Sequence, residues 1–277
     1  MRLLLLAGLL YSCSLMAQEA LPRWELGAGI AGLSFPDYRG AKNINTTVLP
    51  LPYLVYRGDQ LKLSQDGLKL ELFEGGNLEL SLSVSASLPG SDDQDSPRSG
   101  MPELLPTFEA GPSLDYWLQR RLEGQSGWAA RLRLPVRAIL ATNLRQFEDA
   151  GWNSNPHLEN AWRWNSGPWR TRIGMNLGVL WGSERFHDYF YEVQPAFVTA
   201  ERAAHDAKAG YSGLRGSLSL SARHGRWRLG FGLRYDELSG TDFANSPLVE
   251  TESAAFLGFG LAYLFRQSQQ LVRTEPQ

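Results

Sequence analysis

The chain has 277 residues, a formal net charge of −2 at pH 7 and a hydrophobic fraction of 43%. A nearly neutral charge excludes the basic surface of a nucleic-acid-binding protein. No run of about 18 apolar residues follows the N-terminal region, which excludes a membrane-spanning helix. The nine Trp, ten Tyr and 28 Gly are informative, because aromatic girdles and strand glycines are typical of membrane β-barrels.

Residues 1–17 predict a signal peptide. Arg2 supplies the charged region, residues 3–10 the apolar region and residues 15–17 a cleavage site. Cys13, the only cysteine, lies in a segment that also resembles a lipoprotein cleavage box, so both kinds of processing stay open. We expect residues 18–277 to form one domain without a disulfide.

The first half of the chain predicts strands at about 24–33 and 47–56, with large apolar residues at alternate positions. Residues 61–73 form either one bulged strand or two short strands around Asp66-Gly67, a dipeptide that favours a hairpin. Residues 78–88 give the clearest period of two, with Leu and Val on one face and Glu79 and serines on the other. Such a period indicates a strand with two unlike faces.

The second half predicts strands near 106–118, 128–140, 152–164, 169–181, 210–222, 227–235 and 254–265. Six of their boundaries are tryptophans, which suits the two interfaces of a bilayer. In residues 227–235, every second residue is large and apolar, and those between are Gly or Arg. We therefore expect one face of these strands to contact lipid and the other to line an interior.

Loop lengths predict the topology. Short turns at 120–126, 165–168 and 223–226 alternate with long polar loops at 89–102, 142–150, 183–209 and 238–253. In bacterial outer-membrane barrels, short turns are periplasmic, long loops are extracellular and the number of strands is even. This predicts an all-β fold, a transmembrane antiparallel up-and-down β-barrel of about 12 strands, and requires residues 61–73 to split. Residues 189–199 could contain further strands.

Charged residues gather on the face predicted to line the lumen. The candidate lumen-lining residues are Arg131, Arg133, Arg170, Arg172, Arg228, Arg234, Glu79, Glu109 and Asp115. We expect the six arginines to converge, with the acids across the barrel from them. Ion pairs would fill a narrow lumen as a polar core. Separated charges would instead line a wet pore that attracts anions. Pairing is the favoured interpretation, because a barrel of this size needs something inside.

The sequence predicts no catalytic residue, metal or cofactor. The histidines, at positions 157, 187, 205 and 224, occur in no Gly-x-Ser-x-Gly motif. None has further ligands at the spacing of a metal site. We expect them to be exposed in loops. The glycines of residues 27–32 resemble a dinucleotide fingerprint, but no helix follows them.

Several segments are similar to the MipA/OmpV family. They are 24–29 (Trp-Glu-Leu-Gly-Ala-Gly), 36–40 (Pro-Asp-Tyr-Arg-Gly), 51–58 (Leu-Pro-Tyr-Leu-Val-Tyr-Arg-Gly), 188–193 (Asp-Tyr-Phe-Tyr-Glu-Val) and 258–265 (Gly-Phe-Gly-Leu-Ala-Tyr-Leu-Phe). Their order and spacing span nearly the whole mature chain. The chain departs from many outer-membrane barrels in continuing beyond Phe265, the aromatic residue of its last predicted strand.

The resemblance implies a protein of the cell outer membrane, surrounded by its lipid. One family member is described as a scaffold that links a murein-degrading lytic transglycosylase to a murein synthase. The resemblance therefore implies a non-enzymatic interaction protein of peptidoglycan synthesis and remodelling, with those enzymes as partners. It carries over no catalytic residue. The alternative is a small pore for polar or anionic solutes.

Overall fold

The structure is a computed structural model that describes residues 20–58, 61–64, 67–87, 96–120 and 126–273. The predicted signal peptide and Cys13 lie outside these residues. One large antiparallel sheet contains β2 (Trp24–Pro36), β3 (Ile44–Arg57), β4 (Leu61–Ser64), β5 (Gly67–Gly75), β6 (Leu78–Ser87), β7 (Thr107–Gln119), β8 (Gly127–Thr142), β9 (Phe147–Ser154), β10 (His157–Ser166), β11 (Trp169–Gly182), β12 (Gly210–His224), β13 (Trp227–Glu237) and β14 (Ser253–Gln267).

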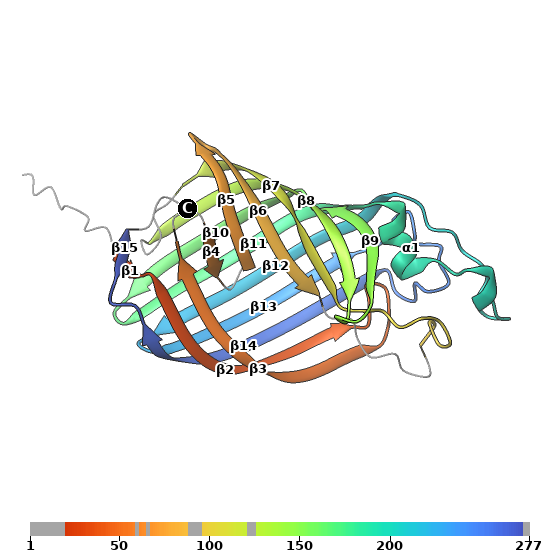
Figure 1. The fold of residues 1–277 in the computed structure, drawn as a ribbon, viewed down its shortest axis with the longest axis horizontal. Helices are drawn as coiled ribbons and strands as arrows, with labels where there is room; N and C mark the ends of the chain where they lie inside the picture. The colour runs from red at the N-terminus through yellow and green to blue at the C-terminus, as the bar shows by residue number, and fades with distance from the viewer. Residues whose placement is uncertain (1–19, 59–60, 65–66, 88–95, 121–125, 274–277) are drawn as a thin grey trace, which may run out of the picture.

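The sheet closes into a barrel because β14 pairs with β2 (Figure 1). β9 and β10 occupy one position in the wall, since both pair with β8 and both pair with β11. The wall is therefore a closed barrel of 12 strands. The predicted fold class and strand number are confirmed, as is the division of residues 61–73 into β4 and β5.

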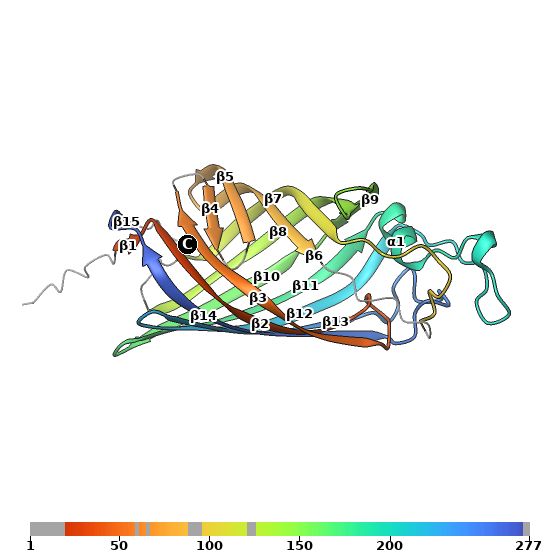
Figure 2. The ribbon, with the colours of Figure 1, turned by 60° about the horizontal axis from the view of Figure 1, so that its bottom comes forward.

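The junction between β3 and β4 is much shorter than the junction between β3 and β2. β4 pairs with β3 only at Tyr56–Leu63 and Arg57–Lys62, whereas β3 pairs with β2 along its whole length. Among the described residues, 44–55 of β3 therefore have no strand partner on the side away from β2. Figure 2 shows that β3 comes close to β4 only near its arrowhead. We call this junction the β3–β4 seam.

The period of two gives the wall an apolar outer face and a polar interior. Leu218, Phe231 and Phe259 face outward and are exposed. Ser113 and Asp115, on the other face of β7, are fully buried. Aromatic rings stand near the strand ends, as where Trp227 meets Tyr263 edge to face at 5.0 Å between ring centroids. An apolar outer band with aromatic girdles is the surface expected of a barrel in a bilayer.

The two ends of the barrel differ. The turn end carries the tight connections at 76–77, 167–168 and 225–226, and the loop end carries the longer segments. At the turn end, β1 (Ala20–Pro22) pairs with β15 (Leu271–Arg273) in a separate two-stranded sheet, which we call the terminal clasp. Arg57 ties this clasp to the barrel by donating to the carbonyl of Pro22 at 2.8 Å.

Two loop predictions need correction. The loop expected at 142–150 reduces to residues 143–146, because β8 and β9 continue beyond the predicted strands. The segment 189–199 contains no strand. Its first residues belong to α1 (Glu184–Tyr191), and the 3₁₀ helix η1 (Pro195–Phe197) follows. Ser183 begins α1, since its side chain accepts from the backbone N–H of Phe186. No helix among the described residues has the length and apolar character needed to cross a membrane.

Candidate functional site

A network of ion pairs occupies the lumen against β7, β8 and β10. Asp115 is fully buried. It lies 3.2 Å from Arg133 and 3.3 Å from Arg131. On the other side of these arginines, Glu159 lies 2.9 Å from Arg131 and 3.5 Å from Arg133, and it also lies 3.5 Å from Arg172. Two arginines therefore alternate with two carboxylates, so that each charge has opposite neighbours.

The acids lie beside the arginines and not across the barrel from them. Asp115 stands directly opposite Arg133 in the register of β7 and β8. Glu109 lies 3.9 Å from Arg137 of β8. Glu79 contacts Lys69 of the adjacent β5 and accepts from Trp117 at 3.2 Å. The expected position was wrong because strands joined by a turn are neighbours, and cross-strand pairs bring opposite charges together.

The six predicted arginines do not form one group. Arg131, Arg133 and Arg172 meet at Glu159, as described above. Arg228 lies 2.9 Å from Glu25, near the turn end. Arg234 lies near the loop end, with its guanidinium 3.4 Å from the centroid of Phe256. Arg170 is exposed at the start of β11.

The sequence prediction missed two carboxylates that organise these contacts. Glu159 holds three arginines of the first group. Asp236 is fully buried and holds Arg215 at 2.6 Å and Arg39 at 2.9 Å. Both could have been identified from the rule that alternate residues of a strand share one face. Glu159 lies on the same strand face as Arg163, and Asp236 follows Arg234 by two positions.

A second feature is a folded cap at the loop end, built from segments 37–43, 96–106, 183–209 and 238–252. Its buried core consists of Tyr38, Ala41, Leu104, Tyr191, Val193, Ala207, Leu238, Phe243 and Leu248. The rings of Tyr191 and Phe243 stack at 3.8 Å with an interplanar angle of 5°. Burial raises the pKa of Tyr191 to about 12. We call this unit the loop cap.

The loop cap reaches opposite parts of the barrel wall. Phe186 and Tyr189 of α1 pack against the buried cluster of Ile139, Ala141 and Ala150 on β8 and β9. Two residues beyond Tyr189, the hydroxyl of Tyr191 donates to the carbonyl of Arg39, in the segment after β2, at 2.9 Å. The helix therefore bridges β9 and the β2 side, and the cap covers the mouth at the loop end (Figure 1).

His187 is buried within the cap, so the expectation of an exposed loop histidine is wrong for this residue. Its ring nitrogens contact the carbonyl of Lys208 and the hydroxyl of Ser212. A histidine beside a serine can activate a nucleophile, but here Ser212 is fully buried and a carbonyl takes the place of an orienting carboxylate. The contact ties α1 to β12. The described part of the chain contains no cluster of three His, Cys, Asp or Glu suited to a metal ion.

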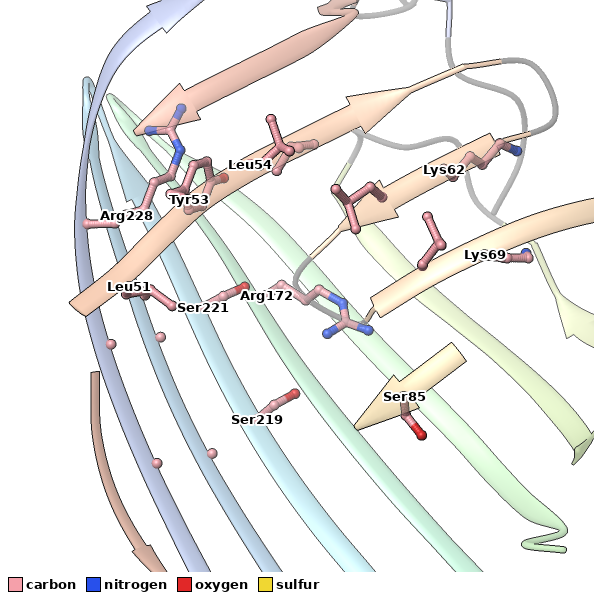
Figure 3. Close-up of a pocket in the computed structure, with 18 of the residues that line it drawn as sticks. Leu51, Tyr53, Leu54, Lys62, Lys69, Ser85, Arg172, Ser219, Ser221 and Arg228 are labelled. Atoms are coloured by element: carbon pink, nitrogen blue, oxygen red, sulfur yellow. The ribbon is translucent and has the colours of Figure 1, made fainter. Parts of the chain in front are cut away.

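The third feature is a cavity of about 860 Å³ beside the β3–β4 seam (Figure 3). Serines of β6 and β12 and Arg172 face it from the lumen. Its lining also includes Leu54, Leu68 and Val84, which stand on the outer face of β3, β5 and β6. The cavity therefore lies in the lumen against the part of the wall where β3 has no partner strand. Its basic residues are Arg57, Lys62, Lys69, Arg131, Arg133, Arg137, Arg163, Arg172, Arg223 and Arg228.

Comparisons with known proteins identify relatives over most of the chain. The MltA-interacting proteins of Escherichia coli (strain K12) and Shigella flexneri are each 25% identical over 272 residues, which cover 95% of this chain and 98% of theirs. Among solved structures, a bacterial polysaccharide outer membrane secretin aligns with a TM-score of 0.37 and 9% identity over 87% of this chain and 99% of its own. The Pseudomonas putida toluene transporter TodX aligns with a TM-score of 0.25 and 9% identity over 88% and 68%.

The family described as "MltA-interacting protein MipA" matches residues 28–265. This range begins within β2 and ends within β14, so it contains the barrel wall, the lumen network and the loop cap. The family is named for an interaction and not for a reaction. The chain belongs to the MipA family.

Proposed function

We propose that this protein is a non-enzymatic scaffold of the outer membrane that binds a murein lytic transglycosylase and a murein synthase. The observation that carries the proposal is membership of a family whose curated relatives are named for their interaction with MltA. The apolar outer band supports the location, because lipid is the solvent that such a surface requires. The buried His187–Ser212 pair offers no accessible nucleophile, which supports a role without catalysis.

The terminal clasp is the proposed docking surface. Short turns mark the periplasmic side of outer-membrane barrels, so the turn end would face the murein layer. Within the described chain, β1 and β15 each pair with one strand only, so each has a free edge. A free strand edge can accept an extended peptide of a partner through main-chain hydrogen bonds. Leu271 is exposed beside this edge.

Co-precipitation with purified lytic transglycosylase and murein synthase tests the proposal. Deletion of residues 268–277 removes β15, whereas the control deletion of residues 274–277 retains it. We expect the first deletion to abolish binding and the second to preserve it, with both barrels folded by heat-shifted gel mobility. Binding that survives loss of β15 would move the docking surface elsewhere. A folded full-length protein that binds neither enzyme would contradict the scaffold function.

A pore is the second candidate, and the basic lining of the cavity favours it. Cations around a wet lumen attract anions. The loop cap and the paired charges oppose an axial path, because both place protein inside the mouth and the lumen. Planar-bilayer recordings separate the two functions. We expect no steady current from the scaffold, and an anion-selective current from the wild-type protein would favour the pore.

A further inference from the structure

The free edge of β3 carries two prolines. Pro50 and Pro52 lie opposite Ile30 and Ala28, and the register between β2 and β3 continues unbroken through both. Proline has no N–H to donate, and in sheets it is confined to edge strands with that side away from the ladder. The missing donors therefore belong to the open edge at the β3–β4 seam. This edge is protected against the addition of another strand.

The cavity lies beside a part of β3 that has one face toward the outside of the barrel and one face toward the lumen. Leu54 is 48% exposed on the outer face, whereas its neighbours Tyr53 and Val55 are buried on the lumen side and line the same cavity. Figure 3 shows Leu54 and Tyr53 on β3, with Ser85 of β6 across the space from them. The open edge of β3 therefore places the cavity within reach of a molecule dissolved in the surrounding membrane.

One side of the cavity is lined by apolar side chains and glycines. Leu33, Leu51 and Val55 line it, and the strands behind them contribute Gly230, Gly232, Gly258 and Gly260. A Cβ added at Gly230 or Gly232 would meet no atom within 4 Å, so these glycines leave open space above the backbone. An apolar wall with such space suits a slender hydrocarbon chain.

The cavity lining also carries many positive charges. Ten Arg and Lys side chains line the cavity, and none of the described lining residues is Asp or Glu. Six carboxylates form ion pairs with this set, namely Glu25, Glu71, Glu79, Glu109, Asp115 and Glu159. Among the described residues, these six carboxylates are fewer than the ten cations. The hydroxyl of Tyr53 is buried without a hydrogen-bond partner among the described residues, although buried tyrosine hydroxyls usually have one.

We propose that the β3–β4 seam is a lateral binding site for an anionic lipid of the surrounding bilayer. The acyl chain passes between β3 and β6 and lies along Leu51 and the glycines. The negative head group lies in the lumen beside Arg172, Ser219 and Ser221. The prolines of β3 disfavour a peptide strand at this edge, and the apolar wall favours a lipid over a small hydrophilic anion. Lipid binding does not depend on the proposed scaffold function.

Native mass spectrometry of the detergent-solubilised protein tests the charge requirement. The probes are phosphatidylglycerol and phosphatidylcholine with identical acyl chains. We expect wild-type protein to retain one phosphatidylglycerol and to discriminate against phosphatidylcholine. Ser219→Asp places a carboxylate beside the head group and should weaken phosphatidylglycerol binding about tenfold. Ser219→Asn has nearly the same shape without the charge and should bind as wild type.

A second pair of variants tests the position of the acyl chain. Gly232→Phe fills the open space in the lumen and should abolish retention of phosphatidylglycerol. Gly216→Phe adds the same side chain to the adjacent strand on the outer face, where a Cβ also meets no atom within 4 Å, and should leave retention unchanged. Heat-shifted gel mobility shows that each variant remains folded.

Three results would overturn the proposal. Equal retention of both lipids would mean that the cations do not select the head group. Equal behaviour of folded Gly232→Phe and Gly216→Phe would mean that the lipid lies on the outer surface and not in the cavity. Displacement of the lipid by inorganic phosphate at equal concentration would mean that the site recognises an anion alone. If the lipid-free Gly232→Phe variant still binds the murein enzymes, the proposed scaffold function holds whichever of these three results is obtained.

Discussion

Asp115→Ala gives the sharpest test of the lumen network. Asp115 accepts from Ser113 at 2.6 Å and lies within 3.3 Å of Arg131 and Arg133, and its side chain is fully buried. Removing one member of a buried ion pair leaves an uncompensated charge and costs about 3–5 kcal/mol. Glu159 still contacts both arginines in this variant, so we expect a loss of unfolding free energy near the lower limit.

Glu109→Ala is the matched control. Its side chain is 19% exposed and lies 3.9 Å from Arg137. A longer and wetter pair of this kind contributes about 0–1 kcal/mol. Urea unfolding in lipid vesicles, followed by tryptophan fluorescence, measures both variants. Equal losses for the two substitutions would refute the reasoning, because they would show that the burial of Asp115 has no energetic consequence.

The double variant Asp115→Asn with Glu159→Gln extends the same test. Each single substitution leaves Arg131 and Arg133 with one carboxylate, whereas the double variant removes both. We therefore expect the double variant to lose more unfolding free energy than the sum of the two single variants, since neighbouring charges share partners. Additive losses would mean that the two carboxylates act independently.

Four further predictions concern other parts of the molecule. Ser99→Cys should react with a membrane-impermeant maleimide on intact cells, whereas Arg226→Cys should react only after the outer membrane is permeabilised; the reverse result would invert the orientation. Phe231→Arg should cost roughly 2–4 kcal/mol in bilayer unfolding if the residue lies near the midplane. Phe243→Ala removes one ring of the stacked pair in the loop cap and should increase proteolysis of the cap while the urea midpoint of the barrel stays unchanged. Burial, and after it the neighbouring acids, raises the pKa of Asp188 from 3.8 to about 6. The protonated carboxyl of Asp188 therefore stabilises the cap below about pH 4, and this stabilisation is lost as the pH rises through 6. Asp188→Asn should remove this part of the pH dependence of hydrogen exchange in α1.

The strands could be predicted because each one carries its own signal. In β13, every second residue from Trp227 to Tyr235 is large and faces outward, and the Arg and Gly residues between them face inward. This alternation is local and needs no knowledge of the partner strand. The division of β4 from β5 has a weaker local signal, and the even strand number of bacterial barrels supplied it.

The partners of the lumen charges could be predicted only in part. The alternation along a strand predicts which side chains face the lumen. The pairing of Asp115 with Arg133 also needs the register of β7 and β8, which contains a bulge. A register shift of one residue exchanges the two faces. Contacts such as Glu25 with Arg228 join residues that are 203 positions apart, and no spacing rule connects them.

The loop cap could not be predicted from local patterns. Its core joins Tyr38, Tyr191 and Phe243 from three separate segments, and no local period in any of them indicates that the three pack together. The β3–β4 seam did have a signal in Pro50 and Pro52. Two prolines at alternate positions mark an edge strand, and a barrel strand with an edge indicates an incomplete junction.

The pairing of β14 with β2 also has a consequence for biogenesis. Strands joined by tight turns can form hairpins while the chain is still being delivered, because they meet soon after they emerge. The closing ladder has to wait for the last barrel strand, since Leu261 must find Ile30 from the far end of the chain. Long-range pairing of this kind makes folding slow. The edge of β2 that pairs with β14 therefore stays unpaired until the last barrel strand is available, and a chaperone would have to shield that edge during the interval.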